Sequence, residues 1–282
     1  MEKKYILTEK TKEYEGYTFY RIQAVKDFGD VKNGQLGGWV ESERNLSQEG
    51  NCWVGNDAMV CGNAKVSGNA MVYGDAVIYG NAKVTDDVKI YGHAEVSGDA
   101  MVSGNSMVYG DAIVYGDAMV YGYAKVYDHA LVTEYAKVCD NTKVCGNAYV
   151  YDNAIISDSA MVFGNSIVYG DAIVDGHALV TEYAKVSGNA MVSNYAIIDG
   201  HAEISFDAIV KSTLDYMVFK NNWSSNRHFT WTRSNNKWKV GCFYGTGEEL
   251  IEKAYKDSKE KGWYYEQFVK FNEKLANHES LE

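Results

Sequence analysis

A six-residue rhythm of hydrophobic and polar positions runs through more than half of the chain. From Val54 to Val210 every sixth residue is valine or isoleucine, which makes 27 consecutive positions without a break. The residue two places before each later position is small, and in 22 of 26 cases it is alanine. The exceptions are Val88, Ser106, Thr142 and Ser166. A period of six fits neither an amphipathic helix nor a plain alternating strand, so the pattern predicts a short strand and a turn, repeated.

Each position of the hexad has a physical explanation. The β-branched residue points inward and stacks on its equivalent in the next coil. Alanine fits an inward position that is too tight for a larger side chain. Glycine followed by asparagine or aspartate supplies the turn, because these residues tolerate a positive φ. Three hexads close a triangular coil of 18 residues, and nine coils at ~4.8 Å each give a rod roughly 43 Å long.

The segment before the repeat, residues 1–53, is predicted to form a cap, because an open β-helix end exposes unpaired strand. Residues 3–8 and 17–25 have the composition of two strands of a hairpin, joined by a charged turn. Val40 and Leu46 fall in step with the later pattern and predict irregular first rungs. The repeat itself is assigned to residues 54–211.

Residues 212–282 are predicted to form a small α+β cap. The expected strands are 214–220, 228–233 and 237–243. A Thr-x-x-Glu capping box from Thr246 to Glu249 opens a helix to about residue 261, and a second helix is expected over 263–276. An aromatic cluster in this cap is either a small core or a partner-binding patch. Its members are Trp223, Phe229, Trp231, Trp238 and Phe243.

The hexads resemble a known repeat. The pattern Val-x-Gly-Asn-Ala-x, seen at residues 60–64, is similar to the bacterial transferase hexapeptide repeat, whose family forms left-handed parallel β-helices. The segments GQLGGWVESERNLSQEGNCWV and FTWTRSNNKWKVGCFYGTGEEL resemble the flanks of uncharacterised phage and prophage proteins with this repeat. The resemblance implies an all-β fold: a left-handed parallel β-helix with an N-terminal hairpin cap and a C-terminal α+β cap.

Charge is concentrated in the repeat. Residues 54–211 contain 19 acidic residues, eight lysines and no arginine, which accounts for the whole net charge of −11. Such a surface should repel nucleic acid. The five cysteines form no CxxC pair, and no apolar run is long enough to cross a membrane. With no signal segment at the start, these features predict a cytoplasmic protein without a membrane partner.

The outward positions of the repeat are unusually apolar. Exposed aromatic and methionine stripes of this size are typical of interfaces, so the chain is predicted to form a homo-oligomer, a trimer as in the transferase family or else a dimer. The predicted interface residues lie on one face of the coil: Tyr73, Tyr91, Tyr109, Tyr127, Phe163, Met71, Met107 and Met161.

Hexapeptide-repeat transferases typically use a histidine near a loop that projects between coils, and they bind coenzyme A between subunits. The repeat here contains no insertion and therefore no projecting loop, so an enzyme is not favoured and no cofactor is expected. If the chain is a transferase, coenzyme A is implied and the candidate catalytic residues are His93, His129 and His177. Two other places could hold chemistry: a groove between subunits, and the C-terminal cap around His228 and Arg233.

Folding the hexads onto an 18-residue coil stacks one column of turn residues. Asp111 should lie between His93 and His129, each roughly 5 Å away along the axis. These three residues are a candidate ligand or partner site, as are Trp231, Arg233 and Trp238 of the cap. The fold also hosts carbonic anhydrases with a three-histidine zinc site, in which two histidines lie five residues apart. No histidine pair here has that spacing, so no metal site is predicted.

Three functions remain open from the sequence. The first is a non-catalytic binding or scaffold protein that acts as a homo-oligomer and takes a host protein or a small ligand as partner; the flanking segments indicate that it is phage-encoded. The second is an acyl- or acetyltransferase with an inter-subunit site. The third is an acidic mimic of duplex DNA, or an inhibitor that sequesters a ligand of a host system.

Overall fold

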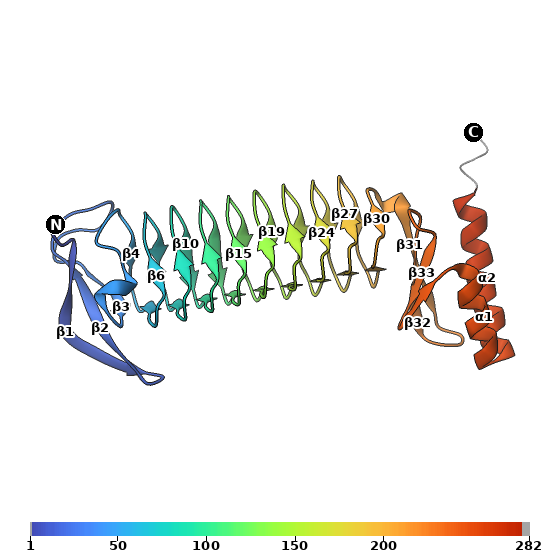
Figure 1. The fold of residues 1–282 in the computed structure, drawn as a ribbon, viewed down its shortest axis with the longest axis horizontal. Coiled ribbons are helices and arrows are strands. Elements are labelled where there is room, and N and C mark those ends of the chain that lie inside the picture. Colours follow the sequence, from blue (N-terminus) through green and yellow to red (C-terminus); the bar gives the residue numbers. More distant parts are fainter. Residues whose placement is uncertain (1, 278–282) are drawn as a thin grey trace.

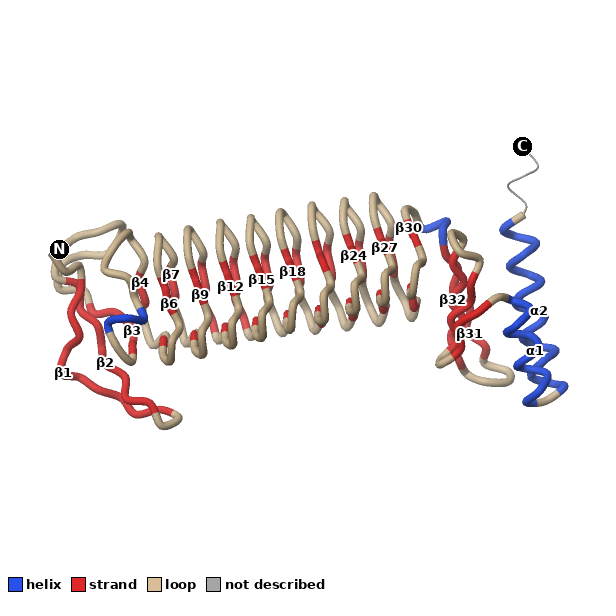
Figure 2. Tube along the Cα trace, in the orientation of Figure 1, coloured by secondary structure: helices blue, strands red, loops and turns tan. Residues whose placement is uncertain are grey.

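The computed structural model describes residues 2–277 and shows a straight rod with a cap at each end (Figure 1). The rod is a left-handed parallel β-helix of about ten turns, with an antiparallel hairpin at its N-terminal end and helices at its C-terminal end. Short strands stack in register along three faces, separated by turns (Figure 2). The predicted fold class is therefore confirmed.

The first face is a 12-stranded sheet that also contains the hairpin, in the order β1-β2-β3-β5-β8-β11-β14-β17-β20-β23-β26-β29. Its strands are β1 (Tyr5–Tyr14), β2 (Tyr17–Ala24), β3 (Leu36–Val40), β5 (Met59–Val60), β8 (Val77–Ile78), β11 (Glu95–Val96), β14 (Ile113–Val114), β17 (Leu131–Val132), β20 (Tyr149–Val150), β23 (Ile167–Val168), β26 (Lys185–Val186) and β29 (Glu203–Ile204).

The second and third faces are nine-stranded parallel sheets. The second face contains β4 (Trp53–Val54), β7 (Met71–Val72), β10 (Lys89–Gly92), β13 (Met107–Gly110), β16 (Lys125–Val126), β19 (Lys143–Val144), β22 (Met161–Val162), β25 (Leu179–Val180) and β28 (Ile197–Ile198). The third face contains β6 (Lys65–Val66), β9 (Lys83–Val84), β12 (Met101–Val102), β15 (Met119–Val120), β18 (Lys137–Val138), β21 (Ile155–Ile156), β24 (Ile173–Val174), β27 (Met191–Val192) and β30 (Ile209–Val210).

The interior of the rod is filled by the repeated valine, isoleucine and alanine positions, nearly all of them fully buried. The turns bring backbone into close contact between coils. Gly98 has a φ of +68°, and a Cβ there would lie 2.8 Å from the backbone nitrogen of Gly116. Where the turn lacks glycine, a polar residue usually adopts the same left-handed conformation, as Asp128 does with a φ of 60°. The hexad therefore specifies both the packing and the turn geometry.

Three hydroxyl residues replace alanine inside the rod without leaving a buried polar group unpaired. Each donates to the backbone carbonyl three residues earlier: Ser106 to Ser103 O at 2.8 Å, Thr142 to Cys139 O at 2.7 Å, and Ser166 to Phe163 O at 2.8 Å. At each of these three positions the turn itself supplies the acceptor that pairs the buried hydroxyl.

The direction of the parallel ladder gives the two ends of the rod different chemistry. Between the coils, many backbone N–H groups of one coil donate to carbonyls of the next coil, as Lys125 N does to Thr142 O at 3.0 Å. The corresponding carbonyls of the first coil have no preceding coil to accept from, and the corresponding N–H groups of the last coil have no following coil to donate to. Because buried backbone groups must be paired, the N-terminal cap has to supply donors and the C-terminal cap acceptors.

The N-terminal cap is the hairpin of β1 and β2 together with the irregular first turn. β3 pairs in parallel with β5, with Val40 beside Val60, and Leu46 forms a parallel bridge with Val66. The two in-step residues thus build a tenth turn, one more than the hexad pattern predicts. The hairpin is confirmed, but the first strand is longer than the predicted 3–8 and the connection is shorter than expected. β1 extends to Tyr14, and only Glu15 and Gly16, both with positive φ, connect the strands.

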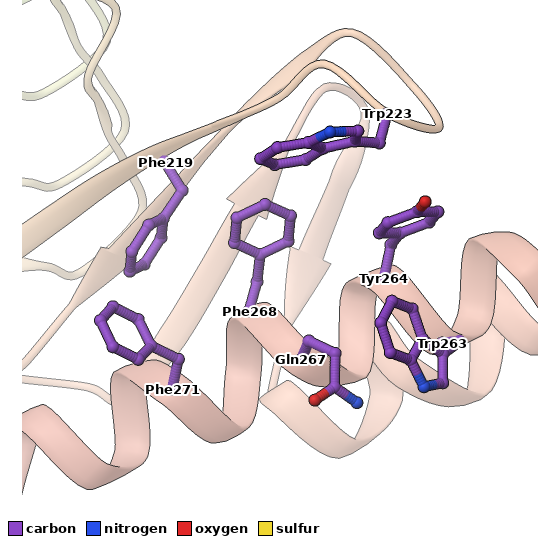
Figure 3. A pocket seen from close by; sticks show the side chains of 7 residues that line it. All are labelled: Phe219, Trp223, Trp263, Tyr264, Gln267, Phe268 and Phe271. Atoms are coloured by element: carbon purple, nitrogen blue, oxygen red, sulfur yellow. The ribbon is translucent and has the colours of Figure 1, made fainter.

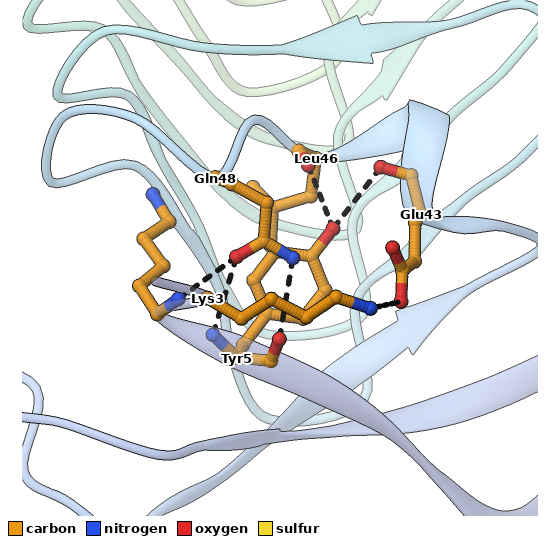
Figure 4. A network of polar contacts seen from close by, with 6 residues as sticks. Lys3, Tyr5, Glu43, Leu46 and Gln48 are labelled. Carbon is orange, nitrogen blue, oxygen red and sulfur yellow. Dashed lines mark hydrogen bonds and ion pairs between the residues drawn. The ribbon is translucent and has the colours of Figure 1, made fainter. Parts of the chain in front are cut away.

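Lys4 and Tyr5 supply donors at this end of the rod. The Lys4 Nζ donates to the carbonyls of Glu49, Gly50 and Cys52 at 3.1, 3.2 and 2.9 Å. The Tyr5 hydroxyl donates to Leu46 O at 2.7 Å (Figure 4). Burial lowers the pKa of the Lys4 ammonium, and the acceptors around it offset part of that cost.

The C-terminal cap packs a four-stranded antiparallel sheet against two helices. Its elements are β31 (Tyr216–Asn221), β32 (Arg227–Thr232), β33 (Lys237–Val240), β34 (Phe243–Gly245), α1 (Gly247–Asp257) and α2 (Lys259–Ala276). The predicted capping box is confirmed, since Thr246 accepts from Glu249 N. The single strand predicted over 237–243 is wrong: a turn at Gly241, with a φ of +58°, divides it into β33 and β34. The first helix also ends four residues earlier than expected.

This cap offers acceptors to the last coil, as the polarity of the ladder requires. Glu203 N donates to Thr230 Oγ1 at 2.9 Å, and Ile209 N donates to Ser234 Oγ at 2.8 Å. Within residues 2–277, no helix is long and apolar enough to cross a membrane.

Candidate functional site

Two hollows lie between the rod and its caps, and both open on the first face. At the N-terminal end the hairpin residues Tyr14, Tyr17 and Phe19 face Val77 and Tyr79 across a space of about 180 Å3. At the other end, the last coils and the C-terminal cap enclose about 350 Å3, which we call the junction pocket. Its lining residues are Asn165, Ile167, Tyr183, Lys185, His201, Glu203, Asn226, Arg227, His228 and Gly241.

A column of stacked rings forms one side of the junction pocket. Tyr183 and His201 are 18 residues apart, and their ring centroids lie 5.0 Å apart with nearly parallel planes. His228, on β32, continues this column from the cap, with its centroid 4.1 Å from that of His201. Two imidazoles from different parts of the chain therefore meet where the cap joins the rod.

Charged groups surround this ring column. Glu203 is the carboxylate of the pocket, and its oxygens lie 3.7 Å from Lys185 Nζ and 4.0 Å from Lys239 Nζ. Arg227 lines the pocket from the cap. Two lysines thus flank the single lining carboxylate and an arginine lines the same pocket, on a chain whose net charge is −11.

The pKa of His228 is lowered by burial first, and then by the charges of His201 and Lys220, while Glu203 opposes the shift. A lowered pKa keeps this imidazole neutral at neutral pH. A neutral imidazole can accept a proton from a bound group or hydrogen-bond to it.

The predicted histidine column exists, with a different pairing. The Nδ1 atoms of His93 and His129 lie 3.7 and 3.5 Å from carboxylate oxygens of Asp75 and Asp111, so each histidine faces the aspartate one coil earlier. The contact between Asp111 and His129 agrees with the prediction. Both imidazoles are about two-thirds exposed, and they stand on turns outside the junction pocket.

His177 belongs to another turn column, where its ring stacks on Tyr195 at 4.9 Å. The three histidines proposed as catalytic candidates are therefore not brought together. Within residues 2–277, no group of three or more histidine, cysteine, aspartate or glutamate side chains could hold a metal ion.

The predicted interface residues all lie along the second face. Tyr91, Tyr109 and Tyr127 form a continuous ladder, with ring centroids 4.8 and 4.9 Å apart and interplanar angles of 6° and 2°. Tyr73 instead packs partly into the core at the N-terminal end of the face. Most residues before the anchors of this face are methionine or lysine, with Trp53 at one end and Leu179 and Ile197 at the other.

Trp231 and Trp238, predicted as candidate site residues, are buried in the cap, so their indole rings cannot face a ligand. Trp238 packs edge-on against Phe229, and Trp231 donates to Asn236 Oδ1 at 2.8 Å. Arg233 is half-buried at the end of β32, and its backbone N donates to Asp215 O at 2.8 Å. The cluster is thus mainly a core, as one of the two interpretations held.

Trp223 is the exception, with two-thirds of its surface exposed. It faces Tyr264 and Phe268 of α2 across an apolar groove of about 320 Å3 (Figure 3). The sequence indicated an aromatic cluster here. It did not reveal the contribution of α2, because the helix and the Trp223 loop meet only in the folded cap.

Comparisons with known proteins identify the type of repeat. The family described as "YdcK Beta solenoid repeat" matches residues 64–80 and 184–200. A 34-residue segment is 53% identical to a protein of Escherichia coli K12 named "Uncharacterized acetyltransferase YdcK", covering 12% of this chain and 10% of that protein. A solved structure of the Francisella novicida UDP-N-acetylglucosamine acyltransferase aligns with a TM-score of 0.47 and 16% identity, over 54% of this chain and 64% of that one. The chain thus spans less than two-thirds of the length of both proteins.

Proposed function

We propose that this hexapeptide-repeat β-helix is a self-associating binding rod, and that its second face is the surface through which copies pair. The observation that supports the proposal is the stacked ladder of Tyr91, Tyr109 and Tyr127 beside Met107 on that face. Large, stiff aromatic side chains and methionine are enriched at protein interfaces.

The other two faces are less suited to pairing. The hairpin and the C-terminal cap both overhang the first face, so a flat partner cannot lie along its whole length. The third face also exposes apolar side chains before its anchors, such as Met101 and Ile209. The residues after its anchors are mostly serine or threonine, as at Ser103 and Ser157, so this face has no continuous aromatic ladder. Burying a stripe of roughly 600 Å2 of apolar surface per subunit would contribute on the order of 15 kcal/mol before the cost of association. We propose a trimer or a dimer.

Tyr91→Asp is expected to weaken self-association more than tenfold, because it places a carboxylate at the first ring of the apolar ladder. Multi-angle light scattering at micromolar concentration should give a multiple of 31.4 kDa for the parent chain and a mass nearer 31.4 kDa for the variant. The matched control is Tyr121→Asp, because Tyr121 lies beside the third face and is almost equally exposed, 38% against 36%. A parent chain that remains at 31.4 kDa contradicts the proposal.

Acyl transfer is a second candidate function, favoured by the two imidazoles in the junction pocket and by the relative named as an acetyltransferase. The neutral imidazole of His228 would take the proton of an attacking amine or hydroxyl, and the thiol of coenzyme A would leave. If the chain transfers acyl groups, the molecule that it binds besides copies of itself would be the acyl acceptor and not a host protein.

This second candidate predicts turnover of acetyl-CoA with at least one member of a panel of amine and hydroxyl acceptors. His228→Gln should reduce that turnover at least a hundredfold, while His129→Gln, at an exposed turn, should leave it unchanged. Release of free thiol is the measurement. Absence of turnover in the parent chain excludes acetyl transfer and leaves the binding rod.

A further inference from the structure

We propose that the junction pocket binds a small phosphate monoester, held by Arg227 and Lys185 and by the imidazoles of His201 and His228. This inference goes beyond both functions above and does not depend on either. It rests on the charges of the pocket, on the hydrogen-bond donors that line it and on its size.

The charges come first. Residues 54–211 contain no arginine and more than twice as many acidic residues as lysines, so the rod repels anions along most of its length. The junction pocket reverses this balance locally. Lys185 Nζ lies 3.7 Å from the nearer Glu203 oxygen, beyond hydrogen-bonding distance, so its ammonium protons remain available to a ligand. Arg227 adds a guanidinium from the cap, and Lys239, 4.0 Å from Glu203, adds a further positive charge behind that carboxylate.

The donors match a phosphate group. An arginine side chain can present two parallel N–H donors to phosphate oxygens, and a lysine adds a compact point charge. The side chains of Asn165 and Asn226 also line the pocket and can donate. The ring of His228 lies 4.1 Å from that of His201 and is partly buried, so protonating His228 is costly unless an anion lies beside it. A dianion offsets that cost.

The size of the pocket sets the class of ligand. A volume of about 350 Å3 lies near the lower end of the range typical of small-molecule sites. It exceeds what a bare phosphate needs and leaves space for a small alcohol moiety beside Ile167 and the ring edge of Tyr183. A sugar phosphate fits this description.

The pocket should respond to pH. His228 faces His201, Lys220, Glu203, Lys185 and Arg227, and in the free protein its pKa is lowered. A bound dianion raises that pKa, so binding takes up a proton and strengthens as pH falls from 8 toward 6.5. Below about pH 6 the phosphate monoester itself takes up a proton, so its affinity for the pocket stops increasing.

Isothermal titration of the full chain with ribose 5-phosphate, inorganic phosphate and ribose tests the proposal. We expect saturable binding of ribose 5-phosphate, weaker binding of inorganic phosphate and none of ribose. Arg227→Gln should weaken binding at least tenfold. His228→Gln should remove most of the gain in affinity between pH 8 and pH 6.5.

His129→Gln is the matched control, because that imidazole also stands beside a carboxylate but lies outside the pocket. Light scattering and the melting temperature of each variant separate loss of the pocket from loss of assembly or folding. Absence of saturable binding to the parent chain overturns the proposal, as does equal binding to Arg227→Gln. Equally tight binding of acetate would overturn the assignment to a phosphate.

Discussion

Replacing Val126 with aspartate is expected to unfold the middle of the rod. Val126 is fully buried and stacks between Val108 of the preceding coil and Val144 of the next. A carboxylate at that position loses its hydration and has no partner, because the surrounding side chains are valine and alanine. We expect a loss of about 4 kcal/mol in the free energy of unfolding, at the upper end of single-residue effects.

Urea denaturation followed by circular dichroism measures this loss. Each coil contacts only its neighbours, so damage at the centre should separate the rod into two shorter units and make the transition less cooperative. The control is Tyr121→Asp. Its side chain is exposed beside the third face, away from the proposed pairing surface, so the variant should keep the parent's midpoint. Equal midpoints for Val126→Asp and the parent would show that the assignment of inward and outward positions is wrong.

The regular part of the rod was predictable because its information is local and repeated. A β-branched residue every six positions and alanine two places earlier determine the inward stack, and spacing alone places Val126 between Val108 and Val144. The first and last turns were harder to predict. Leu46 bridges Val66, but the chain around it does not follow the hexad, since it must also bind the cap.

The candidate site was predictable only in part, because the repeat determines the positions of some of its residues and the docking of the cap determines the others. The 18-residue period places His201 in the column of His93 and His129, and the structure confirms the column spacing. The position of His228 depends on how β32 docks onto the last coil through Thr230, and no local pattern in the sequence records that docking. The sequence therefore indicated the cap around His228 as a place for chemistry without showing that two imidazoles meet there.

The chemistry of the N-terminal end leads to the second large effect, which concerns Lys4. Its side chain is only 1% exposed, yet it carries an ammonium group, and no sequence pattern marks it as interior. The backbone hydrogen-bonding pattern of the β-helix explains why Lys4 is buried at this end. The first coil presents carbonyls with no N–H from a preceding coil, and one ammonium with three donors pairs with three of them.

Lys4→Met is therefore expected to destabilise the N-terminal cap by about 3 kcal/mol, because it leaves the carbonyls of Glu49, Gly50 and Cys52 buried without donors. Hydrogen exchange measured by mass spectrometry should show faster exchange in β1 and in residues 46–54, with little change beyond the second coil. Lys3→Met is the matched control, since Lys3 is half exposed and its ion pair with Glu43 lies at the surface. If the two variants exchange alike, Lys4 does not cap the rod, and water must donate to the carbonyls of the first coil instead. If only Lys4→Met opens the end, the free edge of the first coil should also favour edge-to-edge association of rods, detectable as a concentration-dependent rise in scattering.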